Sequence, residues 1–145
     1  MLSNIKPLGM VLGPVLSMFG KAMRSILKQE GLPYTLEQLY VLHVVRECKE
    51  TVVQQDLAEK LGKDKSFILR IVDSLEKEGL IRRIVDANDR RRNILEITYL
   101  GNQLMNRFFE LELSFTEVLM KDIDKDEMET FYKVITKIRQ NIGDI

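Results

Sequence analysis

Apolar residues recur every three or four positions along most of this chain, which is the spacing of helices with one buried face. The first such run covers residues 8–28. Pro14 lies inside this run and predicts a helix start or a kink near that position. The same periodicity predicts five further helices, over residues 35–48, 54–61, 64–78, 98–121 and 127–142.

Polar residues and glycines mark where several of these helices begin and end. Thr35 with Gln38 fits a capping box, and Asp64 is a good N-cap. Gly62 and Gly79 fit the C-terminal ends of helices. After the Asp64 cap, four apolar residues share one face that we expect to be buried: Ile68, Ile71, Val72 and Leu75.

Two short β-prone segments, residues 80–85 and 93–98, flank a polar stretch rich in Asp, Asn and Arg. Turn-forming residues between apolar segments predict a β-hairpin, here with a charged tip. Residues 51–53 are a further short β-prone segment. The predicted fold class is therefore mainly α with a small β-hairpin wing, in which a winged helix-turn-helix lobe is flanked by N- and C-terminal helices.

The composition is that of a soluble globular protein with one domain. Hydrophobic residues make up 45% and charged residues 30% of the 145 residues. The longest apolar stretch, residues 8–19, is interrupted by glycine, proline and serine, so we expect no membrane-spanning segment and no signal peptide. One cysteine excludes an internal disulfide and falls short of a structural zinc site. We therefore expect a cytoplasmic protein without a cofactor or metal.

The charges balance in total but not along the chain. The sequence has 22 basic and 22 acidic residues. Residues 60–92 hold ten basic and six acidic residues, a net charge of +4, whereas residues 110–145 hold five and nine, a net charge of −4. A polyanion would therefore be attracted to the middle of the chain only.

The order helix, turn, helix, hairpin over residues 54–98 is typical of proteins that bind double-stranded DNA. The helix over 54–61 would brace the next helix in a major groove, and the hairpin would reach the neighbouring minor groove as a wing. Arginine is favoured there because a narrow minor groove concentrates negative potential. Arg90, Arg91 and Arg92 stand at the hairpin tip. They repel one another, so stability alone does not explain them.

Four short motifs follow one another in and around this segment. They are Gln55-Asp56-Leu57-Ala58, Val72-Asp73-Ser74-Leu75-Glu76-Lys77-Glu78-Gly79-Leu80-Ile81, Asp86-Ala87-Asn88-Asp89-Arg90-Arg91 and Ile97-Thr98-Tyr99-Leu100-Gly101. In this order and at these separations, they resemble the MarR family of winged-helix transcriptional regulators. The motifs are confined mainly to residues 54–101, whereas the order of elements matches the family over nearly the whole chain.

The resemblance implies a homodimer. In the family, the first, fifth and sixth helices of two chains interlock, and the winged-helix lobes hang from them as two DNA-reading arms. This assigns residues 1–34 and 101–145 to dimerisation and residues 35–100 to DNA binding, with the recognition helix at about 64–78 and the wing at about 81–98. Two arms about 34 Å apart would meet successive major grooves, which predicts a pseudo-palindromic operator.

Five residues of the predicted recognition helix are candidates for DNA contact: Lys65, Ser66, Phe67, Leu69 and Arg70. Lys65 and Ser66 can contact phosphates or bases, and Arg70 can read a guanine with two hydrogen bonds. Small hydroxyl residues are common in the family at the positions of Phe67 and Leu69. Leu69 either contacts a thymine methyl group or contributes nothing to recognition.

Two aspartates are expected to orient arginines rather than to touch DNA. Asp89 forms the family's Asp-x-Arg motif with Arg91, and Asp73 lies on the recognition helix. For the basic residues of the helix and of the wing, the alternative interpretation is an ordinary solvated surface.

The resemblance also implies regulation by a small molecule. Relatives bind small, often aromatic, acids at the junction of the dimerisation helices and the arm. Met18, Phe19, Tyr40 and His43 are candidates to line such a pocket, with core packing as the alternative. We expect a repressor that leaves its operator when an effector changes the spacing of the arms.

Two other functions remain open. One is a protein-interaction module whose basic tip binds an acidic partner. The other is a redox-sensing regulator using Cys48, against which the neighbouring Glu47 and Glu50 count, because a reactive thiol needs an electropositive setting. No catalytic constellation is recognisable, so we do not expect an enzyme.

Overall fold

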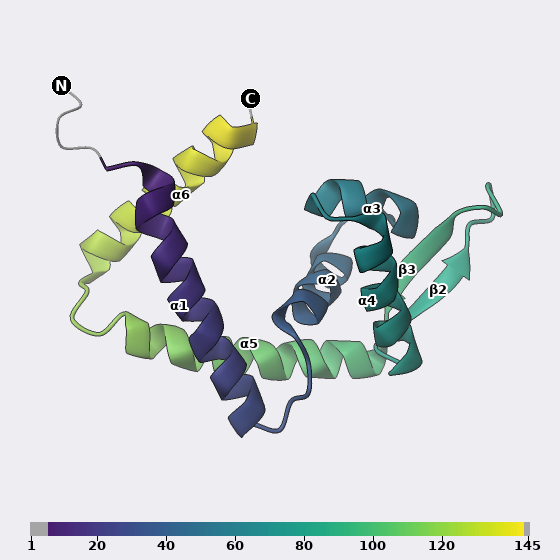
Figure 1. Ribbon diagram of the computed structural model, residues 1–145, viewed down its shortest axis with the longest axis horizontal. Helices are drawn as coiled ribbons and strands as arrows, with labels where there is room; N and C mark the ends of the chain where they lie inside the picture. The colour runs from purple at the N-terminus through teal and green to yellow at the C-terminus, as the bar shows by residue number, and fades with distance from the viewer. Residues whose placement is uncertain (1–5, 144–145) are drawn as a thin grey trace. The chain divides into compact units, whose positions relative to one another are not determined.

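The computed structural model describes residues 6–143, so the outermost residues of both expected dimerisation segments, 1–5 and 144–145, lie outside it. The chain divides into two compact units, up to Leu111 and from Glu112 onward. The elements, labelled in Figure 1, are α1 (Leu8–Gln29), α2 (Leu36–Glu47), β1 (Val52–Val53), α3 (Gln54–Leu61), α4 (Lys65–Lys77), β2 (Ile81–Val85), β3 (Asn93–Ile97), α5 (Tyr99–Leu119) and α6 (Lys125–Gly143). The predicted fold class, mainly helical with a small β-hairpin wing, is confirmed.

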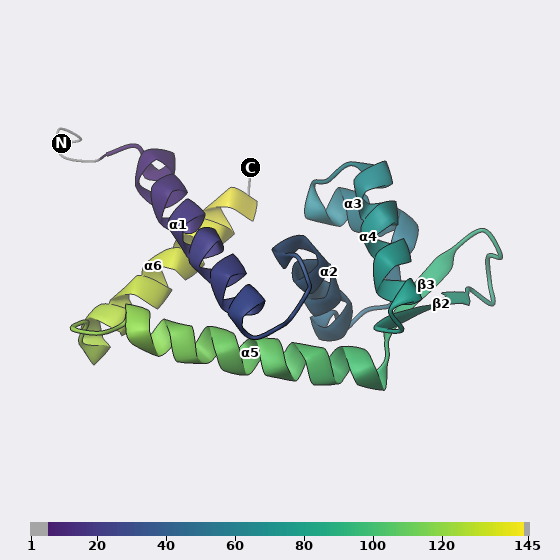
Figure 2. The same ribbon diagram turned by 60° about the horizontal axis from the view of Figure 1, so that its bottom comes forward.

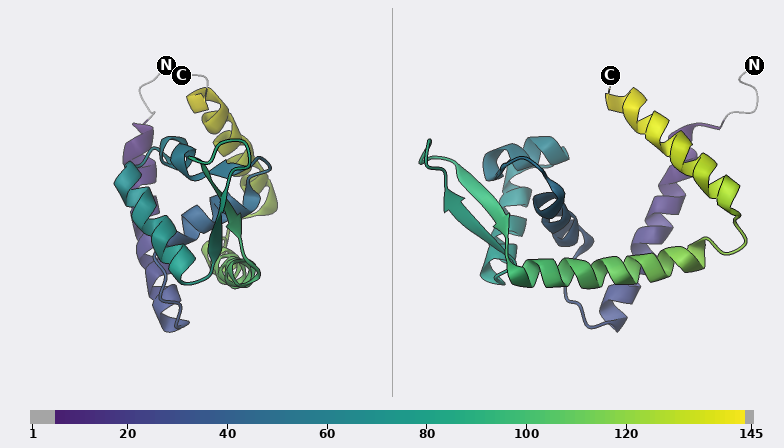
Figure 3. Two further views of the ribbon diagram at one scale, coloured as in Figure 1. Left: turned by 90° about the vertical axis from the view of Figure 1, so that its right-hand side faces the viewer. Right: turned by 180° about the vertical axis from the view of Figure 1, so that it is seen from behind.

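The three strands form an antiparallel sheet in the order β1-β3-β2. Five residue pairs join β2 to β3, from Ile81 opposite Ile97 to Val85 opposite Asn93. The short strand β1 adds two further pairs to β3. Figures 2 and 3 show that the β2–β3 hairpin extends away from α3 and α4. The tip of the hairpin is thereby presented to solvent.

The predicted helix ends are present. Thr35 and Gln38 form a capping box at the start of α2, and Asp64 Oδ1 accepts a hydrogen bond from the backbone N–H of Phe67 at 3.0 Å. Gly62 and Gly79 follow α3 and α4 with positive φ angles of 60° and 72°. A left-handed residue reverses the chain after a helix at little cost when it is glycine. These glycines therefore end both helices of the helix-turn-helix.

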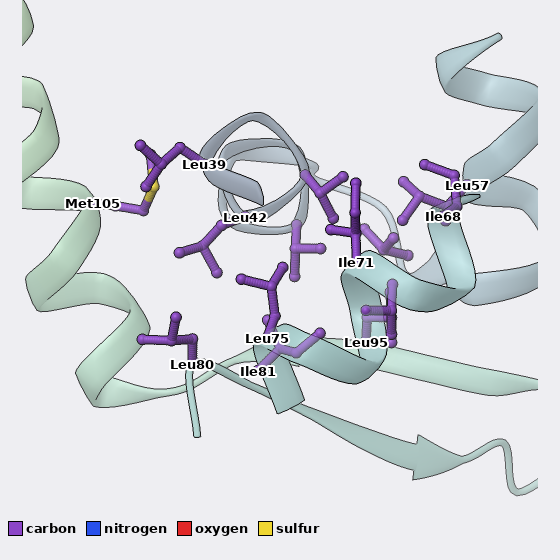
Figure 4. Packing of buried hydrophobic residues seen from close by; sticks show 14 of the residues in the cluster. Leu39, Leu42, Leu57, Ile68, Ile71, Leu75, Leu80, Ile81, Leu95 and Met105 are labelled. Atoms are coloured by element: carbon purple, nitrogen blue, oxygen red, sulfur yellow. The ribbon is translucent and has the colours of Figure 1, made fainter. Parts of the chain in front are cut away.

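One apolar core holds the first unit together. Figure 4 shows side chains from α2, α4, α5 and the sheet pointing into it, among them Leu42, Leu75, Leu95 and Met105. The predicted inner face of α4 is buried in this core, at Ile68, Ile71, Val72 and Leu75. Burying side chains of this size contributes about 1.5–3 kcal/mol each, so the core sets the position of α4 within the lobe.

The start of α5 lies very close to the sheet. Thr98 Oγ1 accepts a hydrogen bond from the N–H of Gly101 at 3.1 Å, as expected for a helix cap. A Cβ atom at Gly101 would lie 2.2 Å from the carbonyl oxygen of Leu80. Only glycine permits this approach, so residue 101 lets α5 begin directly beneath the wing.

Helix α1 is continuous from Leu8, so a helix start near Pro14 is wrong. It is also long and apolar enough, by length and composition, to span a membrane, with a mean hydropathy of 1.2 over 18 residues. This contradicts the expectation that no segment would qualify. Only 11% of that window is buried within this chain. Most of the apolar surface of α1 is therefore left exposed by this chain.

The second unit comprises the end of α5 and the whole described length of α6. Asp122, with a φ angle of 65°, lies between the two helices. Asp124 and Glu127 then cap α6 reciprocally, through hydrogen bonds of 2.9 and 3.1 Å. No residue of α6 is buried, although the helix carries the exposed apolar residues Phe131, Tyr132, Val134 and Ile142.

Candidate nucleic-acid interface

The outer face of α4 is polar and basic. Lys65, Ser66, Leu69, Arg70 and Asp73 are all exposed, on the side opposite the buried residues of the same helix. The exposed residues recur at three and four positions, so they form one continuous stripe. This stripe is the part of the first unit that a partner of the helix would meet.

Phe67 does not belong to this stripe. Its side chain is half-buried and packs against the apolar core. The ring is partly covered by the lobe because the helix turns residue 67 toward α2, on the side of Ile71 and Ser74. Its ring lies beside a surface cavity of about 440 Å³, and its contact with DNA stays a prediction. This cavity is lined by Thr35, Glu37, Gln38, Phe67, Arg70, Ile71 and Ser74.

A tight turn forms the tip of the wing. The backbone N–H of Arg92 donates to the carbonyl oxygen of Asp89 at 2.9 Å. Asp89 Oδ1 also accepts hydrogen bonds from the backbone N–H and from Nε of Arg91, at 3.0 and 3.2 Å. These interactions with Arg91 lower the pKa of the Asp89 carboxyl group. The Arg91 side chain is nevertheless 90% exposed, and Arg90 is exposed as well.

Helix α3 holds the wing loop from the side. Gln55 Nε2 donates to the carbonyl oxygen of Arg91 at 2.7 Å, and Gln55 Oε1 accepts from the backbone N–H of Asn93 at 3.3 Å. Asp56 lies 3.5 Å from Arg92, as an exposed ion pair. Gln55 and Asp56, in the first turn of α3, thus contact the loop that carries the three arginines.

A network centred on Arg83 ties the base of the wing to α4. The guanidinium donates to Asp73 at 2.5 Å, to Gln54 at 2.5 Å and to Glu76. Partial burial lowers the pKa of Arg83, but the two carboxylates more than offset this, so the pKa lies above its usual value. We expected Asp73 to orient an arginine, without naming which one. In the structure, Asp73 binds Arg83 at the base of the wing.

Sequence reasoning missed Arg83, Gln54 and Gln55. The hydrogen bonds of Gln54 and Gln55 join residues that lie 29 to 38 positions apart along the chain. The two carboxylates of α4 that bind Arg83 are closer to it in sequence. One signal was present in the sequence. Arg83 belongs to a strand of the predicted hairpin, and a charged residue at a half-buried position of a strand needs a partner.

The four residues proposed for an effector pocket differ in exposure. Met18 and Tyr40 are exposed, whereas Phe19 and His43 are half-buried. The His43 ring packs against Phe109 of α5 with 5.8 Å between centroids. Its Nδ1 atom is buried without a hydrogen-bond partner in the described structure. A second surface cavity, of about 390 Å³, is lined by other residues, from Arg24 to Glu37.

Cys48 follows α2 and is half-buried. Lys60 Nζ of α3 lies 3.2 Å from its Sγ atom. A hydrogen bond from the backbone N–H of Glu50, together with this ammonium group, lowers the pKa of the thiol. These two interactions outweigh burial and the negative charge of Glu50, which raise the pKa of the thiol. Within residues 6–143, no group of three or more His, Cys, Asp or Glu side chains is arranged to hold a metal ion.

Known proteins share this arrangement of elements. The model of the MarR family matches residues 30–92, from the end of α1 to the wing tip. A solved structure of MarR is similar to this chain with a TM-score of 0.83 and 28% identity, over 99% of this chain and 95% of that one.

Two further solved structures share the fold. Apo MarR from E. coli is 24% identical, with a TM-score of 0.79 over 94% of this chain and 98% of that one. MepR from S. aureus, solved in complex with DNA, is 22% identical, with a TM-score of 0.76 over 95% and 99%. Sequence motifs, element order and near-complete structural overlap agree: residues 30–92 match the MarR family of winged-helix regulators, and the chain has the fold of that family.

Proposed function

We propose that this chain is a homodimeric transcriptional regulator that binds a pseudo-palindromic operator in double-stranded DNA. The observation that carries the proposal is the pairing, within one lobe, of a basic exposed stripe on α4 with an arginine-bearing wing tip. The solved complex of MepR with DNA, a protein of the same fold, supports this use of the lobe.

The stripe on α4 suits the major groove. The groove is about 12 Å wide and admits one helix, which would project its exposed side chains toward base edges. Lys65 and Ser66 lie in the first turn, where they can reach phosphates, and Arg70 can donate two hydrogen bonds to a guanine. The buried face of α4 keeps the helix in the lobe while it binds.

The wing suits the minor groove. Arg90 and Arg91 are exposed at the tip of the hairpin, and the Arg92 side chain forms an exposed ion pair of 3.5 Å with Asp56. An exposed ion pair of this kind contributes little, so its exchange for a phosphate contact costs little. The Arg83 network keeps the wing at a constant position relative to α4, so both elements would dock together.

Dimerisation explains the apolar surface that one chain leaves exposed. In the N-terminal segment up to residue 34, helix α1 exposes Leu8, Met10, Val11, Val15, Leu16 and Met18. In the C-terminal segment from residue 101 onward, α6 exposes the four apolar residues described above. Covering such surfaces with a second copy would stabilise the dimer. The lobe over residues 35–100 then forms one of two DNA-binding arms.

We further propose that the regulator acts in the cytoplasm as a repressor released by a small aromatic or acidic effector. Binding to an operator that overlaps a promoter would block transcription. An effector that binds one spacing of the arms more tightly than the other would release the DNA. The side chains assigned to this pocket are Met18, Phe19, Tyr40 and His43, and the unpartnered Nδ1 atom of His43 supports the assignment.

Selection of bound duplexes from a random pool tests the DNA-binding function. A dimeric regulator should enrich an inverted repeat whose half-site centres lie about 10 base pairs apart. The complementary measurement is transcription from a promoter carrying the selected site. Recovery of no sequence, or of unpaired half-sites only, would contradict the proposal.

A redox-sensing regulator is the second candidate function, favoured by the 3.2 Å contact between Lys60 and Cys48. In that case, oxidation of the thiol would release the operator. The Cys48→Ser variant should then bind DNA normally and stay bound under peroxide. If the wild-type protein keeps its DNA under peroxide, this candidate is excluded.

A further inference from the structure

Leu69 is the one large apolar residue on the exposed stripe of α4. Its side chain is 44% exposed, and it does not belong to the core cluster that holds the helix in the lobe. Its neighbours one turn away are Lys65 and Ser66 on one side and Asp73 on the other. Because lysine, glutamine or alanine would serve the helix equally well, helix formation does not require a leucine here.

We propose that Leu69 contacts the 5-methyl group of a thymine, so that each operator half-site carries a thymine at the position facing this residue. The inference rests on the proposed DNA-binding function and names one base that the site selects. The thymine methyl is the apolar group that base edges present in the major groove, and leucine can bury it without a hydrogen bond.

The residues around Leu69 favour this assignment. Asp73 is engaged with Arg83 at 2.5 Å, so its carboxylate is directed to the wing base and away from the bases. Lys65 and Ser66 are placed for phosphates, and Arg70, the adjacent residue, for a guanine. Leu69 is thus the residue of the stripe that is suited to contact an apolar group of a base, such as the thymine methyl.

Cytosine at the same position would be disfavoured for two reasons. It lacks the methyl group, and its N4 amino group would be covered by a side chain that accepts no hydrogen bond. Uracil differs from thymine by the methyl group alone. A thymine-to-uracil exchange therefore isolates the contact with Leu69 from all other effects of the base.

The experiment replaces each thymine of the selected operator, one at a time in both half-sites, by deoxyuridine. Affinity is measured by fluorescence anisotropy at constant salt. At one position per half-site, the exchange should weaken binding of the wild-type protein about fourfold for each buried methyl. Leu69→Ala should bind the thymine operator more weakly and should not respond to the exchange. Leu69→Met should retain the response.

Leu100→Ala is the matched control, since it removes an equally exposed leucine at the start of α5, outside the stripe and the wing. It should respond to deoxyuridine as the wild type does. Both variants should keep the thermal midpoint of the wild type, because both positions are exposed and alanine favours helices. Uniform insensitivity to deoxyuridine, or an equal response in Leu69→Ala, overturns the inference while DNA binding stands. Failure to select any duplex overturns both proposals.

Discussion

The guanidinium of Arg83 on β2 lies 2.5 Å from the carboxylate of Asp73 on α4. This contact joins the base of the wing to the exposed stripe of the recognition helix. The Arg83 side chain is only 18% exposed, and Gln54 and Glu76 complete its hydrogen bonds. Arg83 therefore links the two elements that are proposed to enter neighbouring grooves.

Replacing Arg83 by methionine should lower the free energy of unfolding by about 1–3 kcal/mol, because several charged hydrogen bonds of a half-buried group are lost. The same variant should bind the operator more weakly, since the wing is no longer held against α4. Urea denaturation and anisotropy measure the two effects. Arg82→Met is the control from the same strand. Its exposed pair with Glu96 should contribute at most about 1 kcal/mol, and an equal loss in both variants would contradict the role of Arg83.

Removing the wing arginines should change the salt dependence of DNA binding. Each cation that neutralises a phosphate contributes about 0.9 to the slope of log affinity against log salt. The double variant Arg90→Ala, Arg91→Ala should therefore bind more weakly with a slope reduced by up to about 2 per wing. The control is Lys133→Ala, Lys137→Ala on α6, which removes the same charge from an exposed face. If both pairs have the same effect, net charge and not the wing accounts for binding.

The exposed apolar face of α1 can be tested through the mass of the protein in solution. Sedimentation equilibrium of the wild type should give twice the chain mass of 16.9 kDa. Leu16, 65% exposed in one chain, should lie in the interface, and Leu16→Glu should shift the equilibrium to single chains. Tyr99→Glu, at an exposed position on α5, should leave the dimer intact. A wild-type mass of 16.9 kDa would refute the dimer.

Gly101→Ala should destabilise the protein although alanine normally stabilises a helix by about 1 kcal/mol relative to glycine. The added Cβ would lie 2.2 Å from the carbonyl oxygen of Leu80 and 2.7 Å from Ile97, so α5 must shift. We expect a loss of about 1–3 kcal/mol in the free energy of unfolding. Gln103→Ala, on an exposed part of the same turn, should change it by less than about 0.5 kcal/mol. Equal stability of Gly101→Ala and wild type would show that the close approach is absent.

Lys60 should control the reactivity of Cys48. The backbone N–H of Glu50 and the Lys60 ammonium favour the thiolate, so the wild-type pKa lies below its ordinary value. The alkylation rate by iodoacetamide should therefore rise at lower pH than for an unperturbed thiol. Lys60→Met should move this profile to higher pH, and Lys60→Arg should retain most of the effect. Identical profiles for wild type and Lys60→Met would exclude the contact in solution.

Much of the fold could be predicted because its signals are local. The Thr35–Gln38 capping box, the Asp64 cap and the glycines that end α3 and α4 each depend on a few adjacent residues. The buried face of α4 follows from apolar spacing alone. Of the two alternatives at Pro14, a helix start or a kink, the start is wrong, because α1 already begins at Leu8.

The rest of the site depends on contacts between distant segments. Periodicity places Phe67 near the polar face of α4, and the packing of α2 against α4 explains why its ring is half-buried. The Arg83 network needs the hairpin to lie across the ends of α3 and α4 at once. This position of the hairpin cannot be derived from the spacing of residues along the chain. The roles of Gln54 and Gln55 could therefore not be predicted from the sequence.

The hydrogen bonds of the Gln55 carboxamide also bear on how the wing loop can change in sequence between relatives. The carboxamide bonds the main chain on both sides of Arg92, while Asp89 bonds the main chain of Arg91. The course of the loop is thus determined by atoms that every amino acid shares. Mutations at positions 90–92 can therefore accumulate without changing the backbone of the loop. Relatives can differ at these side chains, and so in their affinity for DNA, while they keep the same loop.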